Sequence, residues 1–163
     1  GSDGKVTVLE LAWQQQLRKL PAPFDGLGFM TNLTLADSKA KYPTRPGETL
    51  PFIGQSDLTG NFALTYEKNR FFARVALNWR DAHLREDEPI GGDLTQDRWI
   101  DDFKQLDVST SYRFNRHLEA FVEMTNLTNE PFRVYQRGGG QPKRFVQFEE
   151  YGWSANFGVR WKL

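Results

Sequence analysis

Apolar and polar residues alternate strictly at the end of the chain, from Tyr151 to Leu163. Large or apolar side chains occupy one parity, whereas Gly, Ser, Asn, Arg and Lys occupy the other. Because successive side chains of a β-strand point to opposite faces, this pattern predicts a strand with one apolar and one polar face. A tilted strand of about 9–11 residues crosses a bilayer, and this segment is long enough to do so.

The same alternation recurs in six earlier segments, which are separated by turn-forming residues. It is irregular in the first of them and regular in the third to the sixth. A continuation of the sixth segment through 132–136, and a start of the last one at 145, fit the same period. The predicted strands cover residues 5–20, 27–41, 58–66, 71–80, 106–114, 118–125 and 151–163.

Short and long connections alternate between these strands. The short ones are expected at 21–26, 67–69 and 115–116, and the long ones at 42–54, 83–101 and 137–144. Bacterial outer-membrane barrels have short periplasmic turns and longer extracellular loops. The chain is therefore predicted to be all-β, with about seven or eight antiparallel up-and-down transmembrane β-barrel strands and a periplasmic C-terminus.

A count of seven strands leaves closure open, because bacterial single-chain barrels have an even number and lipid tolerates no open edge. Three explanations are possible. The chain contains an eighth strand without a clear alternating pattern, the chain is part of a larger barrel, or an oligomer covers the edge strands.

The alternation also leaves the direction of the apolar face open. That face meets lipid in a membrane barrel, but it turns inward in a soluble up-and-down barrel that binds a small apolar ligand. Aromatic residues near the ends of the apolar stripes, such as Trp79, Tyr112 and Trp161, favour the membrane interpretation, since aromatic girdles mark where strands leave the hydrocarbon.

Two sets of residues follow from the membrane interpretation. The expected lipid-facing residues are Phe62, Leu64, Val75, Leu77, Val108, Val122, Trp153, Phe157, Val159 and Trp161. The expected lumen-facing residues are Asn61, Arg74, Asn78, Arg113, Glu119, Glu123, Asn156 and Arg160.

Composition restricts the chemistry. The 163 residues include no cysteine, which removes disulfides, thiolate metal sites and cysteine nucleophiles. The net charge of zero offers no argument for nucleic acid as a partner. The two histidines lie far apart in the sequence, and no nucleophile elbow occurs. We therefore expect no enzyme activity, no cofactor and no metal site.

Two connections carry charge. The segment 83–101 is rich in Asp and Glu and is interpreted as a solvated acidic loop rather than a calcium site, because its spacing matches no EF-hand. Basic residues flank the glycines at 138–140, and this segment is either a flexible connection or a contact for lipopolysaccharide phosphates or an anionic ligand. The residues of that contact are Arg133, Arg137, Lys143 and Arg144.

Several stretches together resemble the C-terminal β-barrel portion of a TonB-dependent outer-membrane receptor. The resemblance extends over almost the whole chain from Gly4 onward. It rests on the segments at 23–29, 32–34, 126–131 (Asn-Leu-Thr-Asn-Glu-Pro), 149–152 and 156–163.

The resemblance implies a 22-stranded barrel in the Gram-negative outer membrane, of which this chain forms roughly the last third. It also implies uptake of a scarce solute, such as a siderophore, a cobalamin or an oligosaccharide. The partners that it implies are the lipid bilayer, the remaining strands, a plug domain, TonB and the barrel-assembly machinery. No plug domain is recognised in this chain, so we expect it not to transport alone.

The ends of the sequence carry two further expectations. Residues 1–3 are interpreted as a cloning remnant and 4–163 as a single barrel segment, with any export signal elsewhere. An engineered or isolated fragment used as a folding substrate remains an alternative. The ending resembles the signal read by the assembly machinery, through Asn156, Gly158, Trp161 and Leu163, although that signal usually ends in Phe.

Overall fold

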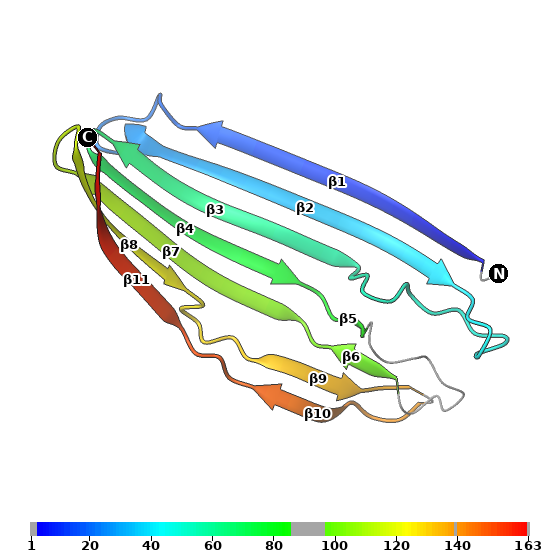
Figure 1. The fold of residues 1–163 in the computed structure, drawn as a ribbon. Coiled ribbons are helices and arrows are strands. Elements are labelled where there is room, and N and C mark those ends of the chain that lie inside the picture. The colour runs from blue at the N-terminus through cyan, green and yellow to red at the C-terminus, as the bar shows by residue number, and fades with distance from the viewer. Residues whose placement is uncertain (1–2, 86–96, 139, 163) are drawn as a thin grey trace.

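The computed structural model describes residues 3–85, 97–138 and 140–162. Its main element is one seven-stranded sheet with the order β1-β2-β3-β4-β7-β8-β11 (Figure 1). Every neighbouring pair is antiparallel, so the two edge strands, β1 and β11, run in the same direction. The strands are β1 (Gly4–Gln16), β2 (Leu27–Ala40), β3 (Leu58–Lys68), β4 (Phe71–Arg80), β7 (Phe103–Arg113), β8 (Leu118–Thr125) and β11 (Ser154–Trp161).

A second, four-stranded sheet extends four of these strands at one end of the molecule (Figure 1). Its order is β10-β9-β6-β5, so each member precedes or follows a strand of the main sheet along the chain. The strands are β5 (His83–Leu84), β6 (Arg98–Ile100), β9 (Phe132–Gln136) and β10 (Arg144–Glu149).

The predicted all-β, antiparallel architecture is confirmed, and the fourth and sixth strands have the predicted bounds. The first strand ends at Gln16 rather than at residue 20, because the Leu20 N–H donates back to the Leu17 carbonyl at 3.1 Å and turns the chain. The third strand continues to Lys68, and the two-residue turn that follows uses Asn69 with a φ of 57°. The segment expected to be a loop from residue 83 to 101 contains β5 and β6 at its ends.

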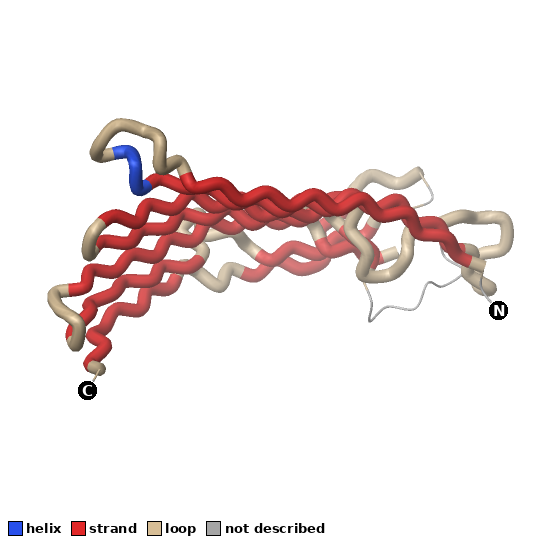
Figure 2. Tube along the Cα trace, turned by 90° about the horizontal axis from the view of Figure 1, so that it is seen from above, coloured by secondary structure: helices blue, strands red, loops and turns tan. Residues whose placement is uncertain are grey.

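Connections of different length lie at opposite ends of the main sheet. Residues 17–26, 69–70 and 114–117 form the short turns, and the first of these includes the 3-10 turn η1 (Phe24–Gly26). Residues 41–57, 81–102 and 126–153 form the long connections. Figure 2 shows η1 and the C-terminus at the end opposite the N-terminus, as predicted for alternating connections.

The sheet is a single layer with little fully buried interior. Ala63 and Ala76, which are paired across β3 and β4, are buried in the main sheet. Leu84 and Val134 are the largest fully buried side chains of the described residues, and both belong to the second sheet. No helix within the described ranges is both long and apolar enough to span a membrane.

Candidate functional site: the two faces of the sheet

The register of the main sheet collects the expected lipid-facing residues on one face, here called the apolar face. Phe62 pairs with Leu77, and Leu64 lies in a cross-strand row with Val75 and Val108. Val122 pairs with Phe157, and Val159 and Trp161 follow on the same parity of β11. Trp153 directly precedes that strand.

Side chains of the apolar face are exposed. Phe157 is 84% exposed, and Trp153 and Trp161 are 60% and 66% exposed. Phe62, Leu64, Val75, Leu77, Val122 and Val159 are exposed as well, whereas Val108 is half-buried. A contiguous apolar surface of this kind is typical of an interaction surface rather than of a surface that faces water.

Aromatic residues lie at both limits of the apolar face. Close to the short turns, ring pairs form between Trp13 and Phe29 (5.5 Å), Tyr66 and Phe71 (6.1 Å), and Tyr112 and Phe114 (5.1 Å). Trp79 lies toward the other end of β4, eight residues after Phe71. At a rise of about 3.3 Å per residue, these two aromatic residues of β4 are about 26 Å apart along the strand.

Trp79 covers Gly60, its partner on β3. A Cβ atom on Gly60 would lie 2.1 Å from the indole ring, which real Cβ contacts do not allow. Glycine at this position therefore leaves the space that the indole ring occupies.

The expected lumen-facing residues share the opposite face, here called the polar face. Asn61 pairs with Asn78 on the neighbouring strand. A second cross-strand row contains Arg74, Ser109, Glu123 and Asn156, and a third contains Arg113, Glu119 and Arg160.

A hydrogen-bond network crosses three strands of the polar face. Asn61 donates to Asn78, which donates to the Asp107 carboxylate at 3.1 Å. Gln105 and the backbone N–H of Asn126 donate to the other carboxylate oxygen at 2.7 and 3.0 Å. The carboxylate thus accepts three hydrogen bonds.

Arg160 is the centre of a second polar contact. Its guanidinium nitrogens lie 3.5 Å from carboxylate oxygens of Glu119 and Glu123. The guanidinium carbon also lies 4.2 Å from the ring centroid of Phe121, a distance typical of a cation–π contact. The expected charged residues of the polar face are thus partly neutralised by one another.

Asn126 has a structural role that its sequence motif did not indicate. It is buried, has a φ of 57°, and lies where β8 ends and the chain bends toward β9. Its side-chain amide donates to the carbonyls of Glu130 and Gly152, at 3.2 and 3.0 Å, and accepts the Glu130 N–H at 2.8 Å. Asn126 therefore joins the two chain segments that link the sheets.

Two of the four basic residues proposed for ligand contact bind the same aspartate. Lys143 Nζ lies 2.6 Å from Asp101 Oδ1, and Arg133 Nε lies 3.2 Å from Asp101 Oδ2. Lys143 also lies 4.1 Å from the ring centroid of Tyr135, a tyrosine whose pKa is raised by burial and by the Asp101 charge. These two cations are therefore engaged by Asp101 beside the second sheet.

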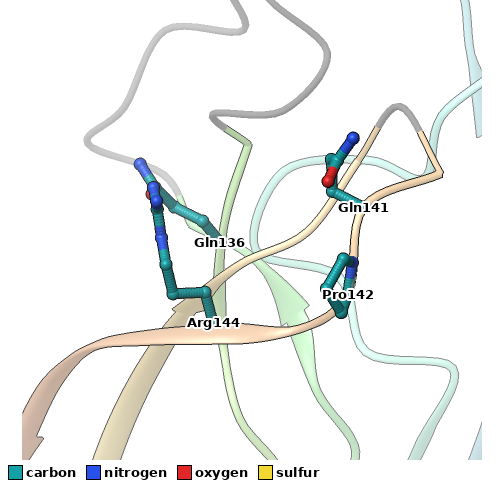
Figure 3. A pocket seen from close by; sticks show the side chains of 4 residues that line it. All are labelled: Gln136, Gln141, Pro142 and Arg144. Carbon is teal, nitrogen blue, oxygen red and sulfur yellow. The ribbon is translucent and has the colours of Figure 1, made fainter.

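The other two, Arg137 and Arg144, are placed differently. The backbone N–H of Arg137 donates to the Asp97 carbonyl at 3.0 Å. Arg144 donates to the Gln136 side chain and lines a hollow of about 320 Å³ together with Gln136, Gln141 and Pro142 (Figure 3). The Arg137 side chain hydrogen-bonds Tyr135, so the side chains of Arg133, Arg137 and Lys143 all contact Asp101 or Tyr135, whereas Arg144 lines the hollow.

A buried cation connects two of the long connections. Arg45, from the connection after β2, lies 2.8 Å from Asp97 and 2.6 Å from Glu48. The hydrogen bond to Glu48 and the contact with Asp97 raise the pKa of Arg45 against the opposing effect of burial. Asp97 belongs to the expected acidic loop, whose residues Glu86, Asp87, Glu88 and Asp93 lie outside the described residues.

Three residues of the expected assembly signal, Asn156, Gly158 and Trp161, lie on β11, and Leu163 is outside the described residues. Phe121 packs against Gly158, whose Cβ position would be 3.0 Å from that ring. Within the described residues, no group of three or more His, Cys, Asp or Glu side chains could hold a metal ion.

Comparison with known proteins identifies the family. Residues 5–127, about three quarters of the chain, match the family model described as TonB dependent receptor-like, beta-barrel. No curated protein and no solved structure matches the chain. Members of this family are receptors and transporters of the Gram-negative outer membrane rather than enzymes. Given a match over most of its strands and an antiparallel sheet with the expected alternation, the chain belongs to the TonB-dependent receptor β-barrel family.

Proposed function

We propose that this chain forms part of the barrel wall of an outer-membrane receptor, with its apolar face against lipid and its polar face lining the lumen. The observation that carries the proposal is the exposed apolar face, which has aromatic residues at both limits. The separation of about 26 Å along β4 suits an apolar band about 25 Å tall with flanking aromatic girdles. The short turns then lie in the periplasm.

The receptor that contains this wall imports a scarce solute: a siderophore, a cobalamin or an oligosaccharide. Family membership supports the transport role, and the partners are a plug domain inside the lumen and TonB. The sheet formed by this chain is open, so the chain alone is not transport-competent. The remaining strands complete the wall.

The edges of the sheet restrict how the wall closes. Within the described residues, β1 pairs only with β2, and β11 pairs only with β8. Because β1 and β11 run in the same direction, two copies inserted in the same orientation would meet through parallel seams. An odd number of further strands closes the sheet with antiparallel pairs alone, which favours completion by other strands of one receptor over an oligomer of this chain.

The extracellular end carries the solute or lipopolysaccharide contact. Arg144 is its principal residue, because Asp101 already binds Arg133 and Lys143 and the Arg137 side chain hydrogen-bonds Tyr135. The hollow beside Arg144 offers a guanidinium and two carboxamides, which suit an anionic or hydroxylated group (Figure 3).

During biogenesis the assembly machinery reads the end of β11 through Asn156, Gly158, Trp161 and Leu163. Asn156 and Trp161 are exposed on opposite faces of this edge strand, which makes them accessible to a partner.

Adjacent residues of β11 provide a sharp test of the membrane placement. Phe157→Arg should destabilise the barrel by about 2–4 kcal/mol if the site is near the bilayer midplane, whereas lumen-facing substitutions cost little. Asn156→Arg is the matched control, because Asn156 is exposed on the polar face opposite Glu123. Asn78 would be a poor control, since it links Asn61 to Asp107.

The measurement is the free energy of reversible unfolding, in lipid vesicles, of the whole receptor barrel that contains this chain, here called the completed barrel. Leu77→Arg extends the test to a central strand. Equal losses for Phe157→Arg and Asn156→Arg would contradict the assignment of the two faces. A barrel that stays monomeric and folded in water without detergent would favour the soluble alternative with a covered apolar face.

A further inference from the structure

The turn between β7 and β8 holds the residue that follows β11. The Lys162 N–H donates to the His117 carbonyl at 2.8 Å, and the His117 Nδ1 atom lies 2.9 Å from the Lys162 carbonyl oxygen. The imidazole is also stacked with the Trp161 ring, with 6.3 Å between centroids and 22° between planes. One histidine therefore contacts two successive residues of the C-terminal segment.

The neighbouring arginine determines which nitrogen of this histidine carries the proton. Arg116 Nε lies 2.9 Å from His117 Nε2 with donor geometry. A guanidinium has only donors, so Nε2 must be the acceptor and must be unprotonated. The proton of the neutral ring is then on Nδ1, which donates to the Lys162 carbonyl.

Asn115 fixes the turn itself. Its side-chain oxygen accepts the backbone N–H groups of His117 and Leu118, at 2.8 and 3.0 Å. This local arrangement is independent of β11 and presents the histidine ring toward Lys162. The sequence of the β7–β8 turn therefore sets the conformation of the turn that contacts Lys162.

The contact matters because β11 is the edge strand of this chain's sheet until further strands complete the wall. It is paired with β8 alone among the described strands, and a slip of one residue would exchange its apolar and polar faces. A side chain that recognises the end of the strand opposes such a slip.

We infer that the β7–β8 turn is a clasp for the end of β11, in which Arg116 holds neutral His117 in its Nδ1–H tautomer and His117 fixes the register of the strand. His117 is a positioning residue for the end of β11.

The tautomer gives a direct spectroscopic test. In the completed barrel in lipid nanodiscs, imidazole 15N chemical shifts at neutral pH should show His117 as the Nδ1–H tautomer, and His117→Asn assigns the signal by its loss. Arg116→Met removes the donor to Nε2, and a mixture with Nε2–H should then appear. A dominant Nε2–H tautomer, or a ring unaffected by Arg116→Met, would overturn the inference.

Hydrogen exchange tests the clasp itself. His117→Ala removes the Nδ1–H donor to the Lys162 carbonyl but keeps the backbone carbonyl that accepts the Lys162 N–H. Loss of the side-chain hydrogen bond should let this strand end open more often and reduce protection of the Lys162 amide by about 3–10-fold. His117→Asn retains a donor near the position of Nδ1 and should keep most of the protection, and the Phe157 amide serves as the internal reference. Wild-type protection in His117→Ala would refute the clasp. Neither readout depends on which face meets lipid, so failure here is distinguishable from failure of the arginine test.

Discussion

Gly60 shows how one residue without a side chain controls the apolar face. Trp79 lies over it on the neighbouring strand, and a Cβ atom would be only 2.1 Å from the indole. We predict that Gly60→Ala destabilises the barrel by about 1–3 kcal/mol, because the indole must leave its low-energy position. Reversible unfolding in lipid vesicles measures this change.

A double-mutant cycle separates steric conflict from other effects of the new methyl group. In a Trp79→Ala background the ring is absent, so Gly60→Ala should become almost neutral. The two substitutions are in contact and should therefore be strongly non-additive. Additive losses would mean that the ring does not lie on Gly60.

His83 should make the stability of the second sheet depend on pH. It is buried in β5, and its Nδ1 atom has no hydrogen-bond partner among the described residues. Burial and the Arg80 charge lower its pKa against the opposing effect of the Asp81 backbone. The unfolded chain, with a histidine pKa of about 6.5, binds the proton more readily. The stabilising contribution of neutral His83 is thus complete above about pH 6.5 and is lost as the pH falls through the folded-state pKa.

Hydrogen exchange of β5 and β6 amides at pH 7.5 and at pH 5.5 measures this effect. Protection should fall at the lower pH in the wild type and should change less in His83→Gln, which cannot titrate. An equal pH effect in both proteins would assign the dependence to another group.

At the scale of the element, strict alternation predicted β4 with its bounds, because polar turns mark both ends. It could not predict β5 and β6, since segments of two and three residues are too short to show a period. The basic residues near 138–140 looked like a free cluster in the sequence, but Asp101 binds Arg133 and Lys143, and Tyr135 binds Arg137. The sequence could not show this, because the aspartate lies more than 30 residues away along the chain.

The role of Asn126 at the junction between the two sheets is visible only in the structure, not in the sequence. Its side chain joins Glu130 and Gly152, and its backbone is left-handed. We predict that Asn126→Ala destabilises the barrel by about 1–3 kcal/mol, because partly buried carbonyl and N–H groups of Glu130 and Gly152 lose their partners. The change is measured by unfolding in lipid.

Asn129 offers a matched control. It has a similar φ of 51° but is exposed, so Asn129→Ala reports the cost of placing alanine in left-handed backbone. The difference between the two variants isolates the side-chain hydrogen bonds. A cost at Asn126 no larger than at Asn129 would remove its role as the junction between the sheets.

At the scale of the whole molecule, the directions of the edge strands determine whether the chain alone can close into a barrel. The edge strands β1 and β11 are parallel to each other, so the seven strands cannot close with antiparallel pairs only. The seven strands of the main sheet were predictable from the alternating segments, whereas β5 and β6 of the second sheet were not. The odd count also indicated that antiparallel pairs alone cannot close the sheet, but the strands that complete it depend on partners that no local pattern encodes.

We therefore predict that the chain alone in detergent shows no heat-modifiable electrophoretic mobility, the property of a closed barrel. Since the sequence contains no cysteine, Leu9→Cys with Val159→Cys reports contact between β1 and β11 without interference. No disulfide should form within one chain, whereas Leu9→Cys with Leu35→Cys, a registered pair of β1 and β2, provides the positive control. A heat-modifiable species that carries the β1–β11 disulfide would mean that a parallel seam closes the seven strands, and the requirement for further strands would then fall.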